Sequence, residues 1–264
     1  MEVGIESPRV LAFDSIGHGK DSVVVLVHGW TLNRSIWSEV GARIAASGPR
    51  VLAPDFPGFG ESPSIDLGGA TVEAYADEVA EFMEPFKARR IALAGHSFGG
   101  YIALALAERH PHVVEGLGLI ASRTTADSEA ARRGRHDTME KVRAGGTKVL
   151  LPALAEKLVG PRAVERRKQA ALLVERARPY GVMAALAAMA PRPDRTAIFD
   201  SFTGPRLVIH GTEDALIPVS EAARIGRGPP DVRVILEGVG HMPMWEAPEA
   251  TAEAIIAWTK ALRA

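Results

Sequence analysis

A glycine-flanked serine at the end of an apolar run is the feature that most restricts the fold of this chain. Residues 91–100 read Ile-Ala-Leu-Ala-Gly-His-Ser-Phe-Gly-Gly, and the stretch 99–109 that follows is typical of a helix. The pattern predicts a buried strand, a sharp turn at Ser97 and then a helix. Such a turn strains the backbone, and we expect glycine at 95 and 99 because a Cβ there would collide with the turn.

A helix that begins directly after Ser97 points backbone N–H groups at whatever the serine hydroxyl attacks. Serine is a poor nucleophile at its own pKa and needs a base within hydrogen-bond reach. A catalytic role for Ser97 therefore requires a base, an acid and donors for an oxyanion elsewhere in the chain. Without them, Ser97 is a structural residue at a helix start.

His241 is the candidate base. It lies in the segment 238–243, Gly-Val-Gly-His-Met-Pro, between the last expected strand and the last expected helix. The glycines permit a close approach, and Pro243 cannot continue a helix through the loop. A loop histidine at the C-terminal end of a strand can reach a site above the sheet edge. We therefore interpret His241 as a catalytic base rather than a surface histidine.

Asp214 is the candidate acid, in the segment 210–218 that reads His-Gly-Thr-Glu-Asp-Ala-Leu-Ile-Pro after an expected strand. A carboxylate here can accept the imidazole Nδ1–H and stabilise the imidazolium. Glu213 is the competing carboxylate. We favour Asp214 because the apolar residues after it shield it from water, and we expect Glu213 to point outward. The order Ser97, Asp214, His241 is the one expected for this type of serine turn.

The oxyanion donors are expected near the dipeptide His28-Gly29, which follows a valine-rich strand. Gly29 lets the chain turn so that the N–H of Trp30 faces the serine. We predict that the backbone N–H groups of Trp30 and Phe98 form an oxyanion hole, in which one donor is typically worth about 3 kcal/mol. We interpret His28 as a brace for its loop rather than as a participant in the chemistry.

The rest of the chain alternates short apolar runs with amphipathic stretches in two blocks. Expected strands are 9–16, 22–27, 50–53, 90–94, 113–121, 206–210 and 232–236. Expected helices are 35–47, 71–86 with Thr71 as N-cap, 99–109, 220–226 and 248–262. Between the blocks the strand signals stop, and the sequence predicts four helices, 128–144, 147–158, 162–177 and 180–189.

This pattern predicts an α/β fold with a mostly parallel, doubly wound sheet. We expect residues 1–121 and 203–264 to form the core domain. Residues 122–202 are expected to form a helical cap, or lid, inserted in it. The insertion follows a strand end, where open α/β sheets bind their ligands.

Composition excludes several classes of protein. The chain has 264 residues and no cysteine, which excludes disulfides, zinc–thiolate sites, iron–sulfur clusters and cysteine nucleophiles. Its net charge of −1 creates no overall field that favours nucleic acid or an anionic membrane. Residues 1–6 lack a basic segment followed by an apolar one, so we expect no secretory signal. The longest apolar runs, 23–27 and 182–190, are too short to span a bilayer.

Three further motifs have structural explanations that we favour. Asp55 begins the glycine-rich loop 54–63, and we expect it to hydrogen-bond the backbone of that loop. The sequence His-Pro-His at 110–112 has no third ligand nearby, so we expect surface histidines rather than a metal site. The arginine clusters at 132–135 and 166–168 alternate with glutamates, which favours solvated helix faces. The alternative is a docking surface for an anionic carrier such as an acyl-carrier protein or coenzyme A.

Together these motifs resemble the α/β-hydrolase superfamily, in its serine carboxylesterase and enol-lactonase-like branch, which includes pimeloyl-carrier-protein methyl esterase-like enzymes. The resemblance covers essentially the whole chain, and residues 122–202 are similar to the helical cap of that superfamily. It is carried by His28-Gly29, Asp55-Phe56-Pro57-Gly58-Phe59-Gly60-Glu61-Ser62, Gly95-His96-Ser97-Phe98-Gly99-Gly100, Asp214 and His241.

Two positions narrow the resemblance. Dehalogenases and epoxide hydrolases carry aspartate at the nucleophile position and are disfavoured, because position 97 is serine. Some members place the acid after an earlier strand. Here that segment reads Ser122-Arg123 and offers no carboxylate, which supports Asp214.

The sequence therefore predicts a carboxylesterase that cleaves esters of small or medium acyl chains through an acyl-enzyme, without a metal or an organic cofactor. Alternatives are a lactonase or an acyl-thioester hydrolase on the same triad, or a ligand receptor of the same fold with slow turnover. Expected pocket residues are Gly29, Leu154, Met183, Leu186 and Met242. We expect a small-molecule ester substrate, no nucleic-acid or membrane partner, a monomer or homodimer, and a cytoplasmic location.

Overall fold

The computed structural model describes residues 11–19, 22–64, 66–86, 90–225 and 232–262. In this part of the chain, seven strands form one sheet in the order β1-β3-β2-β4-β5-β6-β7. The strands are β1 Phe13–Ile16, β2 Ser22–Val27, β3 Arg50–Pro54, β4 Arg90–His96, β5 Gly116–Ile120, β6 Arg206–Gly211 and β7 Val232–Leu236. β1 pairs antiparallel with β3, and every other pair is parallel. The predicted α/β fold with a mostly parallel sheet is confirmed.

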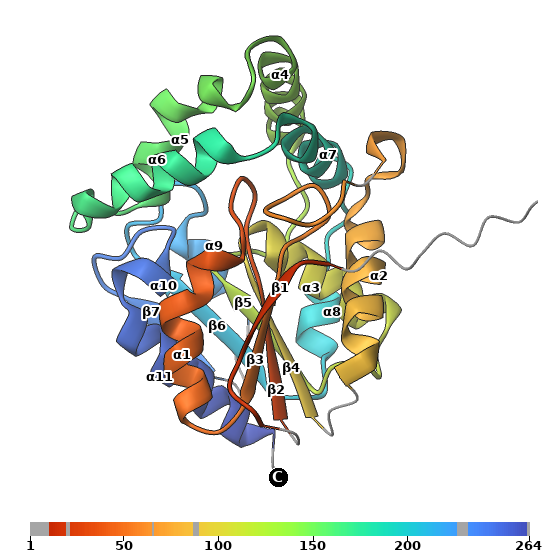
Figure 1. The fold of residues 1–264 in the computed structure, drawn as a ribbon, viewed down its shortest axis with the longest axis vertical. Helices are drawn as coiled ribbons and strands as arrows, with labels where there is room; N and C mark the ends of the chain where they lie inside the picture. Colours follow the sequence, from red (N-terminus) through yellow and green to blue (C-terminus); the bar gives the residue numbers. More distant parts are fainter. Residues whose placement is uncertain (1–10, 20–21, 65, 87–89, 226–231, 263–264) are drawn as a thin grey trace, which may run out of the picture.

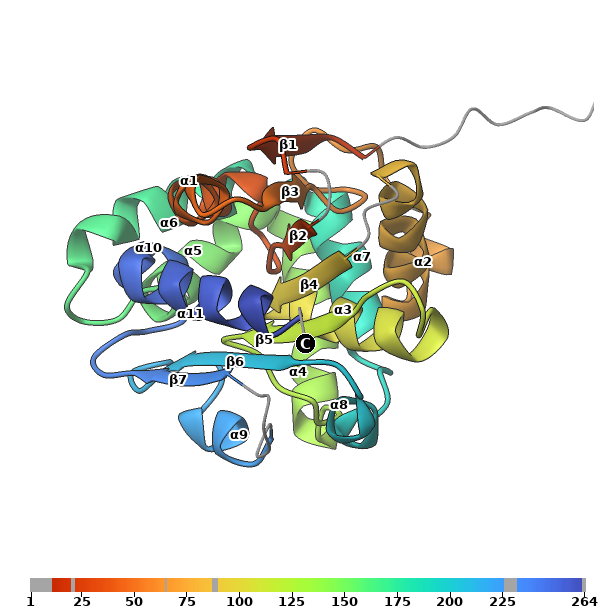
Figure 2. The same cartoon turned by 90° about the horizontal axis from the view of Figure 1, so that it is seen from below.

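Helices cover both faces of the sheet (Figure 2). One face carries α1 (Ser38–Ala46) and α11 (Pro248–Ala261), and the other carries α2 (Val72–Met83) and α3 (Phe98–Arg109). Because helices cover β2 on both sides, each residue from Val23 to Val27 is buried, which explains its continuous valine run. The short helices α9 (Val219–Ala223) and α10 (Pro243–Glu246) follow β6 and β7.

Several element ends differ from the prediction. The strand expected over 9–16 begins at Phe13, and residues 9 and 10 lie outside the described part of the chain. The helix expected over 35–47 is divided into a 3₁₀ turn, Arg34–Trp37, and α1. The Asn33 side chain accepts the N–H of Ser35 and caps the start of the turn. Thr71 is the N-cap of α2 as predicted, since its hydroxyl accepts the N–H of Ala74 at 3.0 Å.

The connection between β5 and β6 is helical. It contains α4 (Glu129–Gly145), α5 (Leu151–Leu158), α6 (Arg167–Arg176), α7 (Pro179–Met189) and α8 (Thr196–Ser201). α4 to α7 lie together beyond one end of the sheet, whereas α8 lies beside α3 (Figure 1). The sequence did not predict α8, because six residues are too few to show a helical period. The division into a core and a cap at residues 122 and 202 stays a prediction.

Arg178, directly before α7, links this helix to the loop that follows β3. Its guanidinium donates to three carbonyl oxygens of that loop, those of Phe59, Gly60 and Ser62, at 3.3, 2.6 and 2.6 Å. Arg178 therefore supplies a donor to the carbonyl oxygens of Gly60 and Ser62 and a second donor to that of Phe59, which also accepts the Ser62 N–H at 3.0 Å.

The backbone of α7 makes two further contacts, with the loop after β3 and with Trp30. A Cβ on Gly181 would lie 2.1 Å from the carbonyl oxygen of Gly58, so the helix and the loop touch where only glycine fits. The indole Nε1–H of Trp30 donates to the carbonyl oxygen of Val182 at 3.1 Å. These contacts set the height of α7 above the sheet edge.

A buried charge cluster joins the segment before α4 to the end of α7. The Asp127 side chain is inaccessible to solvent and forms ion pairs with Arg123, Arg135 and Arg192. The guanidinium of Arg192 also lies 3.9 Å from the ring centre of Tyr101. Burial alone would raise the pKa of Asp127, but the arginines outweigh burial and lower it.

We expect the substitution Asp127→Ala to lower the free energy of unfolding by about 3–5 kcal/mol, because it leaves the buried Arg192 guanidinium and the partly buried Arg123 and Arg135 without their carboxylate. The matched control is Glu129→Ala, two residues along the chain. Glu129 pairs with Arg133 on the surface, and its loss should cost less than about 1 kcal/mol. Urea denaturation measures both values, and equal losses in the two variants would contradict the prediction.

Candidate active site

Ser97 occupies the turn between β4 and α3, as the sequence predicts. Its backbone has φ 52° and ψ −114°, a conformation that non-glycine residues rarely adopt. Hydrogen bonds to β5 and to the residues after it hold the turn. The Ser97 N–H donates to the carbonyl oxygen of Ile120 at 2.9 Å, and the Ser122 hydroxyl donates to the carbonyl oxygen of Ser97 at 2.8 Å. These two hydrogen bonds therefore hold the Ser97 backbone in its strained conformation.

The two flanking glycines are required for different reasons. A Cβ on Gly95 would lie 2.1 Å from the carbonyl oxygen of Gly99, which is the expected collision with the turn. A Cβ on Gly99 would instead lie 2.6 Å from the carbonyl oxygens of both Val27 and His28. The expectation for Gly99 is thus corrected: the obstacle is the end of β2, packed against the start of α3.

His241 and Asp214 are brought together although 27 positions separate them. The imidazole Nδ1 lies 2.7 Å from Asp214 Oδ2, and both side chains are buried. Asp214 Oδ1 accepts the N–H groups of Leu216 and Ile217, each at 2.9 Å. The carboxylate is an acceptor, so Nδ1 donates and the lone pair remains on Nε2. Glu213 is exposed, in agreement with the prediction that it points outward.

Asp214 is held in its ionised form. Burial alone would raise its pKa, but the charge of the His241 imidazolium and hydrogen bonds from His210, His241 and Ile217 outweigh burial and hold the pKa well below the ordinary aspartate range. An ionised carboxylate is the form that stabilises a neighbouring imidazolium.

Two further histidines, which were not among the predicted site residues, complete the network. His210 is buried at the end of β6, with Nε2 2.8 Å from the carbonyl oxygen of Ile217 and 3.3 Å from Asp214 Oδ2. His96, next to Ser97, places Nε2 2.8 Å from the carbonyl oxygen of His241. Burial and the neighbouring His241 lower the pKa of His96 well below its usual value, so a neutral ring donates this bond. Their positions at strand ends beside the candidate residues were the available signal.

The backbone at Gly29 lies against the serine turn, as the predicted oxyanion hole requires. A Cβ on Gly29 would lie 2.7 Å from His96 Nδ1 and 3.3 Å from the Ser97 Cβ. Phe98 is the first residue of α3, where a helix leaves its N–H groups without intrahelical acceptors. The role of the Trp30 and Phe98 N–H groups as oxyanion donors stays a prediction.

Residues 24–254 match the family model described as "Alpha/beta hydrolase family". The chain belongs to the α/β hydrolase family. It is 32% identical over 247 residues to the pimeloyl-[acyl-carrier protein] methyl ester esterase of Aromatoleum aromaticum, an alignment that covers 86% of this chain and 93% of that protein.

Solved structures of α/β hydrolases agree with this assignment. A thermophilic esterase from Thermogutta terrifontis, solved with malate bound, is 33% identical and superposes with a TM-score of 0.90 over 96% of this chain and 94% of that one. The enol-lactonase from Burkholderia xenovorans LB400 has a TM-score of 0.83 over 95% and 96% of the two chains, at 21% identity, and so supports the fold alone.

His28 of this α/β hydrolase braces two loops. Its Nδ1–H donates to the carbonyl oxygen of Gly29 at 2.8 Å, and its Nε2 accepts the N–H of Phe56 at 3.0 Å. Burial lowers the pKa of His28, which keeps the ring neutral and able to accept. These bonds agree with the interpretation of His28 as a loop brace.

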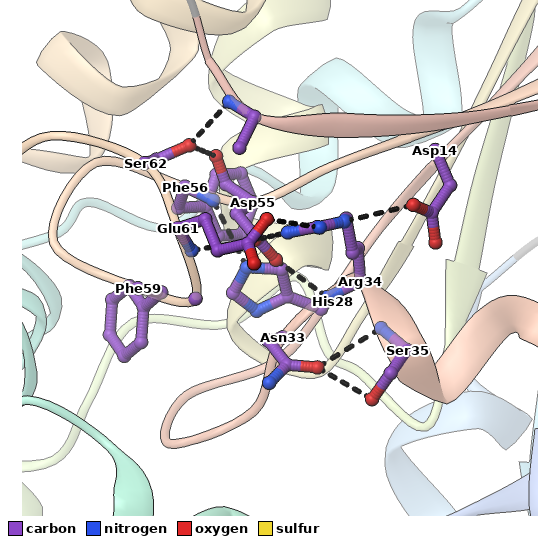
Figure 3. A network of polar contacts seen from close by, with 12 residues as sticks. Asp14, His28, Asn33, Arg34, Ser35, Asp55, Phe56, Phe59, Glu61 and Ser62 are labelled. Atoms are coloured by element: carbon purple, nitrogen blue, oxygen red, sulfur yellow. Dashed lines mark hydrogen bonds and ion pairs between the residues drawn. The ribbon is translucent and has the colours of Figure 1, made fainter.

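Asp55 organises the loop after β3, as expected (Figure 3). Its carboxylate accepts the N–H groups of Arg34 at 2.7 Å and Glu61 at 2.9 Å and pairs with the Arg34 guanidinium. That guanidinium also reaches Asp14 and the side chain of Glu61. The Asp55 carboxylate is bound both by its own loop and by Arg34, which agrees with a structural role.

The predicted pocket residues lie on four parts of the hydrolase, and Gly29, after β2, is one of them. Leu154 is on α5, Met183 and Leu186 are on α7, and Met242 follows His241. Leu154, Leu186 and Met242 are buried, and Met183 is partly buried. Their contact with a substrate stays a prediction, as does that of Gly29.

The described segments contain neither a candidate metal site nor a candidate membrane-spanning helix. No group of three or more histidine, cysteine, aspartate or glutamate side chains there is arranged to hold a metal ion. No described helix combines the length and the apolar character needed to cross a bilayer. Of the His-Pro-His motif at 110–112, His110 bonds Asp77 at 2.7 Å.

Proposed function

We propose that this α/β hydrolase cleaves carboxylic esters of small or medium acyl chains, with Ser97 as nucleophile, His241 as base and Asp214 as acid. The observation that carries the proposal is the buried 2.7 Å contact between His241 and Asp214. His241 is linked to the strained turn at the end of β4, because Nε2 of His96, the neighbour of Ser97, lies 2.8 Å from the His241 carbonyl oxygen. The names of the esterase relatives support ester substrates.

In the proposed mechanism, Ser97 Oγ attacks the ester carbonyl carbon while His241 Nε2 takes the hydroxyl proton. The N–H groups of Trp30 and Phe98 stabilise the oxyanion, and ionised Asp214 stabilises the imidazolium. His241 then protonates the leaving alcohol. Water, deprotonated by His241, attacks the acyl-enzyme, and release of the acid restores the Ser97 hydroxyl.

The proposal is tested with a p-nitrophenyl phosphonate ester, which transfers its phosphonyl group to an activated serine. We expect one adduct per chain on the peptide that contains Ser97, together with loss of esterase activity. Ser122 is a matched internal control, because its hydroxyl is nearby but is bonded to the Ser97 carbonyl oxygen. An adduct on Ser122, or no adduct, would remove Ser97 from the mechanism.

A panel of p-nitrophenyl esters from C2 to C12 separates the alternatives. We expect multiple turnovers on the short and medium chains. A single burst of p-nitrophenol without further turnover would favour the alternative of a ligand receptor with the same fold. Labelling of Ser97 with no turnover on any ester would favour a lactone or thioester substrate.

A further inference from the structure

The carboxylate of Glu246 binds backbone on both sides of the candidate base. Oε2 accepts the N–H of Gly240 at 2.9 Å, and Oε1 accepts the N–H of Met242 at 3.1 Å. These two donors flank His241 directly. The carbonyl oxygen of Met242 in turn accepts the Glu246 N–H at 3.0 Å, which closes the loop into one turn of chain.

The same carboxylate reaches the segment that follows α5. Glu246 Oε2 also accepts the N–H of Gly160 at 2.9 Å, across 86 positions of sequence. The two backbones touch closely: a Cβ on Gly160 would lie 2.8 Å from the Gly240 nitrogen, and a Cβ on Gly240 would lie 2.3 Å from the Gly160 nitrogen. One carboxylate therefore holds together the base loop and the predicted cap.

The surroundings make this a strong and specific arrangement. Among the described residues, the hydrogen-bond donors to the Glu246 carboxylate are the three backbone N–H groups of Gly240, Met242 and Gly160. Burial raises the pKa of Glu246, and the three backbone hydrogen bonds and the charge of His241 oppose that rise. A partly buried carboxylate is costly to leave without hydrogen bonds. The three N–H groups that donate to Glu246 are therefore held in fixed positions relative to one another.

We propose that Glu246 is a positioning residue that couples the seating of the cap to the alignment of His241. The imidazole is fixed by Asp214 and the His241 carbonyl by His96, whereas the amides on either side are fixed by Glu246 together with Gly160. Displacement of the cap segment would therefore displace the base relative to Ser97. A misplacement of about 1 Å can cost about 10²-fold in rate. This inference rests on the proposed function.

The test compares Glu246→Gln with Glu249→Gln. In Glu246→Gln one acceptor oxygen becomes an amide nitrogen that faces a backbone N–H, while the size of the side chain is kept. Glu249 lies three positions along the chain, is exposed and pairs with Arg43 on the surface. For a p-nitrophenyl ester, we expect kcat of Glu246→Gln to fall about 10–100-fold with KM changed less than about 3-fold. Glu249→Gln should leave both constants unchanged.

A second variant addresses the cap side. Gly160→Ala keeps glutamate at 246 but places a Cβ 2.7 Å from Glu246 Oε2 and 2.8 Å from the Gly240 nitrogen, so it disturbs the same contact from the Gly160 side. We expect it to lower kcat in the same way, and we expect the double variant to lose less than the product of the two single losses, because both act through one contact. Unchanged kcat in Gly160→Ala would overturn the coupling to the cap, whether or not Glu246→Gln folds.

Two further readouts separate structure from positioning. If Glu246→Gln melts at a lower temperature but keeps wild-type kcat per folded molecule, Glu246 is structural only and the inference fails. The wild-type enzyme is labelled with the phosphonate ester in parallel. If the wild type is labelled and turns over ester while Glu246→Gln has a normal kcat, only this inference is overturned. If the wild type is neither labelled nor active on esters, the proposed function is overturned as well.

Discussion

Replacement of Ser97 by alanine is expected to lower kcat for p-nitrophenyl esters by at least ~10³-fold and towards ~10⁶-fold, the scale of nucleophile removal in serine hydrolases. The upper figure corresponds to about 8 kcal/mol of activation free energy. The substitution removes the only atom of residue 97 that can form the acyl-enzyme. Steady-state kinetics with active-site titration measures the loss, and near-normal turnover would contradict the assignment.

The stability of position-97 variants provides the control. Alanine keeps the Cβ at φ 52°, so Ser97→Ala should unfold at the same denaturant concentration as the wild type. Glycine relieves a strain of about 1–3 kcal/mol, so Ser97→Gly should be equally inactive but more stable. A Ser97→Gly protein less stable than Ser97→Ala would show that the turn is not strained.

The substitution Asp214→Asn is expected to lower kcat by about 10⁴-fold, as in other triads whose acid is made neutral. The asparagine amide has only one oxygen. If that oxygen accepts the N–H groups of Leu216 and Ile217, the amide NH₂ faces His241 Nδ1 and cannot accept its proton. The imidazole then loses the acceptor that fixes its tautomer and the negative charge that stabilises its protonated form. Glu213→Gln is the matched control, because Glu213 is adjacent and exposed, and it should stay within about 2-fold of the wild type. The reverse result would make Glu213 the acid.

The same substitution has a consequence for stability at acid pH. The pKa of Asp214 in the folded protein lies below the value of about 3.9 expected in the unfolded chain. Ionised Asp214 therefore contributes fully to stability above about pH 3.9. This contribution is lost as the pH falls from about 3.9 towards the folded pKa. Between pH 6 and pH 3 the wild type should therefore lose more unfolding free energy than Asp214→Asn. Equal losses in urea titrations would contradict the lowered pKa.

Local sequence patterns were sufficient for the fold. The valine run of β2, the Gly-x-Ser-x-Gly turn and the Thr71 cap each depend on neighbours a few positions away, so period, composition and spacing reveal them. The order of the elements then restricts the topology, because parallel strands joined by helices have few permitted arrangements. The candidates Ser97, Asp214 and His241 could be named because each follows a strand end, and such ends meet at one edge of a parallel sheet.

By itself, the sequence determined the α/β class, the mostly parallel sheet and the residues that follow its strand ends, because these depend on short-range periodicity and chain order. Only the tertiary structure decided which groups hold the candidate catalytic residues in position. His96 meets His241 across 145 positions, and Glu246 meets Gly160 across 86. Gly99 is required by β2 rather than by its own turn. Such contacts are set by close packing between distant segments, and no local pattern in one segment records the identity of its partner.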